Sequence, residues 1–519
     1  MRMRSTDWPL VIIHSTAMVA LVISLLSGFR LAQDSQHAVA VVQRLQWLLP
    51  QGDVFFWHGL SALIWIGVML AYAGYLLLRD KPLAAVKSKR LLIQSLKVVL
   101  PLSLVTGLLL YFSPQSLSFL WLLEIHYYLA IMVVLLASLH ILLQLQSGIK
   151  PTLAIFLFRR APAKHSLPLC IGVLVAGLCF FYYPSLTPKL VSQHTAQPVR
   201  IDGISDEWTQ ITESYLWLGQ GANQGQQLRV SARSMHDEHV VYFLFRWQDT
   251  EPSYQHLPLI KTAQGWQVRQ QGFATDDEQQ FYEDKFAVML SHSARFGAAG
   301  SIHLGAKPRA DLPESRSGRG YHYLKQGLVD VWQWKAARLS HMSVLDDDHF
   351  AQPVKVCDYC PRYTAGYQTD AKDAGGYRMN WQWFDANTVV PLRLPKAEFM
   401  AQFLPSSGSE LGADLSQYAI SWWDTQAYSE HLDTYPIGTA LPSVLLLDQF
   451  EGDRGDVRAV ATWQDGFWQL EIARNRQTHS EHDLNIESGI YIWPASFDAN
   501  QTRHSYSQQP WQLVLEQQG

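Results

Sequence analysis

Residues 120–145 read LWLLEIHYYLAIMVVLLASLHILLQL, an apolar run with two histidines in it. A helix rises about 1.5 Å per residue and a hydrocarbon core is about 30 Å thick, so this run is long enough to cross a membrane. His126 and His140 are 14 residues apart. At about 100° and 1.5 Å per residue they lie within about 40° of one helix face and about 21 Å apart. We therefore predict a transmembrane helix with one imidazole near each side of the membrane.

Four more apolar runs precede residue 185, whereas the rest of the chain is polar and rich in Gln and Trp. This contrast predicts a membrane domain over residues 1–185, a linker over 186–196 and a second domain over 197–519. The net charge of −4 argues against a nucleic-acid binder held by bulk charge. The five predicted spans are residues 10–31, 54–78, 91–112, 120–145 and 167–184.

Lys and Arg residues occupy alternate loops between these spans, and such loops face the cytoplasm. Because the number of spans is odd, the second domain is then outside. We therefore predict a bacterial inner-membrane protein with a cytoplasmic N-terminus and a periplasmic C-terminal domain. The basic residues are Arg2, Arg4, Arg79, Lys81, Lys87, Lys89, Arg90, Lys150, Arg159, Arg160 and Lys164.

Histidines inside the spans are the first candidate functional residues, since ionisable groups in a bilayer are costly and usually functional. His58 and His126 lie near the outer leaflet in this topology, and His14 and His140 lie near the inner leaflet. Depth thus pairs His58 with His126 and His14 with His140. Two imidazoles on facing helices are a ligand set for a haem iron. The alternative is that each is a core histidine bonded to serine or to backbone.

This histidine pattern resembles that of the di-haem cytochrome b subunits of membrane hydrogenases and formate dehydrogenases, over about residues 5–185. The resemblance implies the same two pairs, two b haems in a four-helix bundle, and a quinone site near one haem. No short motif identifies the residues of that quinone site. Such cytochromes often dimerise, so a homo-oligomer is one expected state. His37 and His165 sit in loops or at span ends and are expected at the surface.

The second domain has the pattern of an all-β sandwich. Short alternating runs such as Leu228–Ala232 are separated by polar turns. Val457–Trp463 and Phe467–Ile472 flank Asp465-Gly466, a dipeptide typical of a tight hairpin turn. Residues 340–430 show weak periodicity, which predicts a long insertion.

Two resemblances attach to this domain. The opening Ile201-Asp202-Gly203, followed by Asp206 and Trp208, is shared with carbohydrate-binding sandwich modules. More of the chain, about residues 200–515, resembles the haem-binding subunit of ethylbenzene dehydrogenase and its relatives. The segments that carry this resemblance are Arg246-Trp247-Gln248-Asp249, Asp284-Lys285-Phe286-Ala287-Val288, Val329 to Ala336, Trp463-x-x-Gly466-x-Trp468 with Arg474, and Arg503-His504-x-x-Ser507.

The second resemblance implies one haem held between loops of the sandwich by two axial residues. The corresponding positions here are His303 and His504, with Met235 as an alternative ligand. The dehydrogenase subunits have Met and Lys at these positions, so this chain departs in ligand type. Two histidines would lower the haem potential relative to Met ligation. Trp334 and Lys335 are expected to cap the haem pocket or to contact the propionates.

Two further motifs stand outside this set. Cys357 and Cys360 form a Cys-x-x-Cys followed by Pro361, without the histidine of a c-type haem attachment. A disulfide is expected there, with a metal or redox-active pair as the alternatives. Asp346-Asp347-Asp348 is expected to be a solvated loop, with a cation site as the alternative.

These observations predict a membrane electron-transfer protein. Electrons would pass between the quinone pool and a periplasmic redox partner through two membrane haems and one outer haem, in a direction left open. Quinol oxidation is the enzymatic activity that this scheme allows. One alternative is a sugar- or small-molecule-binding module anchored by a di-haem bundle. Another is an enzyme whose outer haem keeps an open iron position.

Overall fold

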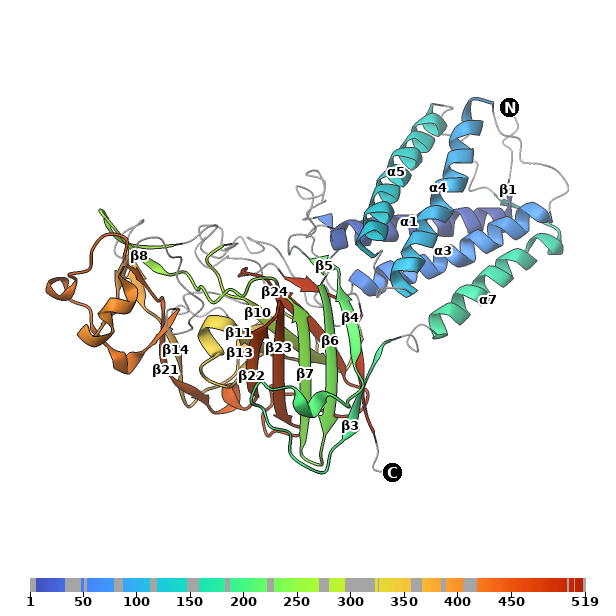
Figure 1. Cartoon of the computed structure of the whole chain (residues 1–519). Helices are drawn as coiled ribbons and strands as arrows, with labels where there is room; N and C mark the ends of the chain where they lie inside the picture. The colour runs from blue at the N-terminus through green and yellow to red at the C-terminus, as the bar shows by residue number, and fades with distance from the viewer. Residues whose placement is uncertain are drawn as a thin grey trace. The chain divides into compact units, whose positions relative to one another are not determined.

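The computed structural model divides the chain into two compact units, Met1–Thr187 and Pro188–Gly519 (Figure 1). The first unit is helical and the second is rich in β-strands. The structure describes residues 6–32, 48–50, 54–78, 87–112, 119–146, 158–182, 187–221, 228–269, 280–294, 323–324, 326–355, 366–383, 389–404, 418–501, 504–507 and 509–516.

Five helices of the first unit are long and apolar enough to cross a membrane, which confirms the predicted apolar spans. Large apolar side chains stay exposed on them, among them Leu91, Trp121 and Phe181. A helix satisfies its own backbone hydrogen bonds, so such a surface suits a lipid environment. The helices are α1 (Trp8–Ala32), α3 (Val54–Leu77), α4 (Lys87–Phe112), α5 (Phe119–Leu145) and α7 (Leu167–Tyr182).

The fifth predicted span packs directly on the second. A Cβ on Gly67 of α3 would lie 2.6 Å from the carbonyl oxygen of Gly172 in α7, and a Cβ on Gly172 would lie 2.3 Å from that of Gly67. Only glycine allows two helix backbones to approach this closely, as in other membrane helix pairs. α3 also packs against α1, and α4 packs against α5.

The second unit is built on a sheet of 14 strands, in the order β13-β12-β11-β10-β24-β26-β3-β6-β7-β23-β22, with β4, β5 and β25 attached to it. The strands of the first half are β3 (Lys189–His194), β4 (Ser214–Leu218), β5 (Gln220–Gly221), β6 (Leu228–His236), β7 (Val240–Gln248) and β10 (Lys285–Ser291). The others are β11 (Val329–Lys335), β12 (Asp346–Phe350), β13 (Tyr367–Thr369), β22 (Arg458–Gln464), β23 (Phe467–Asn475), β24 (Tyr491–Phe497), β25 (Ser505–Tyr506) and β26 (Trp511–Leu515).

The two halves of this sheet share one aromatic core. Phe243 of β7 contacts Trp332 of β11, with ring centroids 6.2 Å apart. Trp247 stacks on Phe286 of β10 at 4.3 Å. Aromatic side chains bury much apolar area, so these contacts join the inner faces of both halves. The β-rich character expected for the second domain is confirmed.

The predicted hairpin is also present. β22 and β23 pair from Arg458↔Ala473 to Gln464↔Phe467. The two turn residues, Asp465 and Gly466, have φ angles of 52° and 80°. Positive φ at both central residues matches the right-handed twist of the flanking strands, and Asp-Gly accepts it at low cost.

Three predicted features of this domain are wrong. Lys189–His194 of the predicted linker are not a linker, because they form β3, which pairs in parallel with β26 and β6, and Leu190 is fully buried. The insertion does not begin at 340, because β12 and β13 extend the main sheet. Asp346-Asp347-Asp348 is not a solvated loop, because it forms β12 and all three residues are 0% exposed. A run of aspartates lacks the apolar alternation by which a strand is recognised.

Smaller sheets cover residues between these strands and have a core of their own, which includes Trp266, Tyr435 and Leu445. Their strands are β8 (Leu259–Thr262), β9 (Gly265–Val268), β14 (Ala374–Met379), β15 (Trp381–Trp383), β16 (Val389–Pro391), β17 (Arg393–Pro395), β18 (Ala419–Ser421), β19 (Thr425–Ala427), β20 (Ala440–Leu441) and β21 (Val444–Glu451).

Candidate functional site

The helical unit brings two histidines of separate helices close together. The rings of His58 in α3 and His126 in α5 have centroids 6.2 Å apart and planes at 86°. A metal–imidazole bond is about 2 Å long, so two axial imidazoles on one metal hold their centroids roughly 6 Å apart. The spacing of this pair therefore fits two axial ligands of a single iron.

In each of the two imidazoles, the Nδ1 atom lies within hydrogen-bond distance of a serine or threonine hydroxyl group. The Nδ1 atom of His58 lies 3.0 Å from Ser27 Oγ, and that of His126 lies 3.0 Å from Thr106 Oγ1. Each hydroxyl donates its own hydrogen to a carbonyl of its helix. A hydroxyl that donates to this carbonyl accepts from Nδ1–H, and that tautomer leaves the lone pair on Nε2, the form that binds a metal.

A glycine follows each of these hydroxyl residues and lies against the imidazole. A Cβ on Gly28 would lie 3.0 Å from His58 Cε1, and one on Gly107 would lie 2.9 Å from His126 Cε1. Ser27-Gly28 and Thr106-Gly107 thus form the same device twice. Sequence reasoning missed all four residues, although a hydroxyl-glycine dipeptide in the span before each histidine was the available signal.

The two histidines of the second predicted pair also lie in the helical unit. His14 of α1 and His140 of α5 are both half-buried. They lie near enough for their ring charges to interact. The helices that carry them, α1 and α5, belong to the same compact unit.

His165 is not a surface residue, in contrast to the prediction. It lies in a 3₁₀ turn, η3 (Ala163–His165), and is 6% exposed. Its Nδ1 atom is 3.1 Å from Asp7 Oδ2, which also accepts the hydroxyl of Tyr75 at 2.8 Å. The position of His165 near the end of a predicted span could not reveal these partners, because they come from distant parts of the chain. His37 lies outside the described residues.

Two of the outer-domain predictions also lie outside the described residues. They are the first predicted haem ligand, His303, and the Cys357–Cys360 pair. The second predicted ligand, His504, is half-buried, with its ring 4.8 Å from that of Phe497 and 5.5 Å from that of Tyr506. An aromatic surrounding of this kind suits a flat macrocycle as well as ordinary packing.

The remaining predicted contacts are engaged within the protein. Trp334 lies in the core, 4.6 Å from the ring of Trp468. The ammonium group of Lys335 forms a buried ion pair with Asp346. Burial opposes the charge of Lys335, but Asp346, Tyr377 and Asp348 together outweigh it and raise the pKa of this lysine. Met235 is buried in a small cluster with Trp208.

Two aspartates of the family-like segments meet in space. Asp249 follows β7 and Asp284 precedes β10, and their carboxyl groups are hydrogen-bonded to each other. Asp284 also accepts the backbone N–H of Ser253 at 2.6 Å and of Ala499 at 2.9 Å. Burial raises the pKa of Asp249 to about 6 and also raises the pKa of Asp284. The pair therefore binds a proton more tightly in the folded state than in the unfolded state.

This pair predicts that the stability of the second unit, Pro188–Gly519, depends on pH. Because the folded pKa of Asp249 lies above the unfolded value, its contribution is fully present below about pH 4. It is lost as the pH rises through about 6, by at most ~3 kcal/mol. Asp249→Asn keeps a donor but cannot ionise, so its unfolding free energy is expected to change less between pH 4.5 and 8. Parallel curves for the two proteins in urea titrations would contradict the shared proton.

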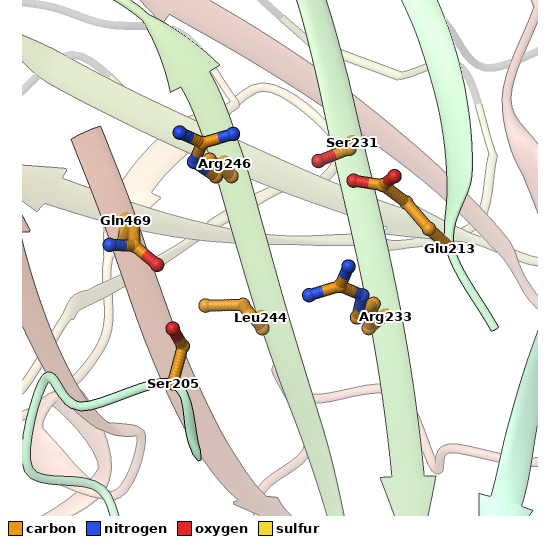
Figure 2. Close-up of a pocket in the computed structure, with 7 residues that line it drawn as sticks. All are labelled: Ser205, Glu213, Ser231, Arg233, Leu244, Arg246 and Gln469. Carbon is orange, nitrogen blue, oxygen red and sulfur yellow. The ribbon is translucent and has the colours of Figure 1, made fainter. Parts of the chain in front are cut away.

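A polar cavity of about 330 Å³ lies on the outer face of the main sheet. Figure 2 shows the guanidinium groups of Arg233 and Arg246 on neighbouring strands of this face. The Nε atom of Arg233 is buried without a partner among the described residues. Two cations beside polar groups suit a small anionic or hydroxylated ligand. The cavity is lined by Ser205, Glu213, Ser231, Arg233, Leu244, Arg246 and Gln469.

Comparison with known proteins gives a family match in the second unit. Two structures of a carbohydrate binding module family 9 from Caldicellulosiruptor kristjanssonii, with glucose and with cellotriose, each cover 64% of this chain at 9% identity and a TM-score of 0.22. They are themselves covered to 97% and 95%, and a TM-score this low supports no conclusion. No curated protein matches the chain. A family model described as ethylbenzene dehydrogenase matches residues 196–509. The chain therefore belongs to the ethylbenzene dehydrogenase family.

Proposed function

We propose that this protein is a membrane cytochrome that carries electrons between the quinone pool and a redox partner outside the membrane. The observation that carries the proposal is the pairing of His58 and His126 at 6.2 Å, each with Nδ1 engaged and Nε2 left for a metal. Haem b bound there would supply reversible one-electron transfer. Membership of the ethylbenzene dehydrogenase family and five apolar helices are compatible with a membrane-anchored, cytochrome-like electron carrier.

The chain's own residues have distinct roles in this proposal. His58 and His126 hold one b haem near the outer leaflet, and His14 and His140 hold a second near the inner leaflet. Ser27 and Thr106 orient the first pair. In the proposed topology, which the basic loops support, the N-terminus is cytoplasmic and the second domain is periplasmic, across a bacterial inner membrane. Quinol oxidation and quinone reduction are both open to this arrangement.

The sandwich would hold a third haem in the proposal, with His303 and His504 as axial ligands. Trp334 and Lys335 would then act indirectly, through the core and through Asp346, since their side chains contact Trp468 and Asp346. A soluble periplasmic redox protein would exchange electrons with this haem.

Haem content tests the proposal directly. The full chain, purified in detergent from bacterial membranes, is expected to contain three non-covalent b haems, counted by pyridine haemochrome against protein. His303→Ala and His504→Ala should each lower the count by one and leave the membrane haems unchanged. A protein without haem would overturn the electron-transfer role. A protein with two haems that ignores both substitutions would restrict that role to the membrane unit.

The hydroxyl group of Thr106 gives a finer test. Thr106→Val removes the acceptor for Nδ1 of His126, so the imidazole becomes a weaker and less oriented ligand. Loss of such a partner lowers metal affinity about 10–100-fold in other sites. We expect faster transfer of one haem to apomyoglobin and a raised midpoint potential, both restored by Thr106→Ser. An unchanged potential would assign Thr106 a packing role alone.

The polar cavity supports a second candidate function, a small-molecule-binding sandwich on a haem-containing anchor. Arg233 and Arg246 would bind carboxylate or hydroxyl groups of the ligand. Equilibrium binding of an anionic sugar such as glucuronate, lost in Arg233→Met, would favour this function. Absence of binding with a full complement of three haems would favour electron transfer.

A further inference from the structure

A cluster of buried aspartates lies at one edge of the sandwich. Asp330 of β11, Asp347 of β12 and Asp483 after β23 each place a carboxylate oxygen within 4.8 Å of the others. Asp330 and Asp347 are 0% exposed, and the side chain of Asp483 is 1% exposed. Carboxylates this close and this dry repel one another strongly unless positive charge lies among them.

The protein supplies too little positive charge for this cluster. Arg474 places Nη2 2.7 Å from Asp483 and 3.3 Å from Asp330. A fourth carboxyl group, that of Asp456, lies beside Asp347. Within the described part of the chain, Arg474 is the one basic side chain recorded in an ion pair with these aspartates. Four carboxyl groups share this one guanidinium, and full ionisation of the four would leave three negative charges without a counter-charge among the described residues.

Several carboxylate oxygens of this cluster lack a hydrogen-bond donor in the described part of the chain. Both oxygens of Asp347 and Oδ1 of Asp330 are buried and accept no N–H or hydroxyl group of the described residues, and the contact of Asp347 with Asp456 is one between two carboxyl groups. Oδ2 of Asp330, in contrast, accepts the backbone N–H of Leu484 at 3.1 Å. Buried carboxylate oxygens are normally saturated with donors, so open ones point to a missing cation.

We propose that Asp330, Asp347 and Asp483 bind one Ca²⁺ ion. Ca²⁺ takes oxygen ligands at about 2.3–2.6 Å, so oxygens that share one ion lie no more than about 5 Å apart, and the carboxylate oxygens of this cluster, all within 4.8 Å of one another, meet that condition. Mg²⁺ prefers a smaller octahedron that retains several waters, which a dry cage of carboxylates does not provide. The ion would join two neighbouring strands to the segment that follows β23. The site is independent of the proposed electron-transfer role.

Calcium binding to the full-length, detergent-purified protein tests this site. After chelation and desalting, we expect equilibrium dialysis with ⁴⁵Ca²⁺ to find one ion per chain at this site. Tryptophan fluorescence should report a Tm higher by about 4 °C at a hundredfold excess of Ca²⁺ over Kd. Mg²⁺ at the same concentration should raise Tm much less.

Two variants and a control locate the ion. Asp347→Asn and Asp483→Asn should each lose the bound ion and the Tm rise. Both remove a repelling charge, so without Ca²⁺ their Tm should equal or exceed that of the parent. Glu471→Gln is the control, because Glu471 is equally buried but accepts three N–H groups, from Asp202, Gly203 and Trp208. It should keep the full calcium response.

Two results would overturn the proposal. If the chelated protein binds no Ca²⁺ and shows no change in Tm, protons shared among the carboxyl groups hold the cluster together instead. If Asp347→Asn and Asp483→Asn both keep the ion and the Tm rise, the ion binds elsewhere. Should Asp347→Asn fail to fold, Asp483→Asn alone decides between the same outcomes.

Discussion

His126→Ala is expected to remove one haem from the purified protein, and Gly107→Leu is expected to remove the same haem without touching a ligand. The alanine deletes one of the two imidazoles whose ring centroids lie 6.2 Å apart. The leucine acts through space, because even a Cβ at position 107 would lie 2.9 Å from the ring of His126. A side chain there must push the imidazole off the axis on which a metal binds.

Haem counting and the reduced-minus-oxidised spectrum measure this effect. Gly177→Leu is the matched control, since a Cβ on that glycine of α7 would meet no described atom within 4 Å. It adds the same bulk to a membrane helix and should keep all haems. If Gly107→Leu keeps its full haem count with an unchanged spectrum, the glycine does not position the ligand. Equal loss in Gly177→Leu would reduce the result to a folding defect.

Arg474→Met is expected to destabilise the outer domain by about 3–5 kcal/mol, the usual cost of leaving a buried charge without its partner. Arg474 is 1% exposed and neutralises Asp330 and Asp483. Its Nη1 atom also donates to the backbone carbonyls of Asn475 and Leu484. The substitution therefore removes a counter-charge and also removes the hydrogen-bond donor of two backbone carbonyl groups.

Chemical denaturation of the chelated protein, followed by tryptophan fluorescence, measures this loss. Arg229→Met serves as the control, because Arg229 is exposed and lies 4.0 Å from the ring of Tyr215. An exposed cation–aromatic contact contributes about 0.5–1 kcal/mol. A loss below 1 kcal/mol in Arg474→Met would show that the aspartates around it are protonated rather than charged.

Local patterns in the sequence were enough for the coarse architecture. A run such as residues 120–145 predicts a membrane helix by itself, because a helix satisfies its own backbone and needs no partner. Asp465-Gly466 predicts a hairpin because the turn depends on two φ angles. The segments around Trp247, Lys285 and His504 pointed to the ethylbenzene dehydrogenase family, which the match over residues 196–509 confirms.

Depth along the predicted spans also paired His58 with His126, and the structure places these two rings together. The residues that orient them were not foreseen. Ser27 and Thr106 read as ordinary span residues until the fold brings their hydroxyl groups to Nδ1. Whether the histidines bind haem remains a prediction.

Buried charge is the part that only the tertiary structure decided. Asp346-Asp347-Asp348 has the composition of a solvated loop, yet β12 places it inside the sandwich beside Arg474 and Lys335. His165 ends a loop in the sequence but pairs with Asp7 at the start of the chain. The periodicity of apolar residues depends on residues that are close in the sequence, so helices and strands can be recognised from a short segment. The cost of burying a charge depends on counter-charges that come from distant strands, and only folding brings them together.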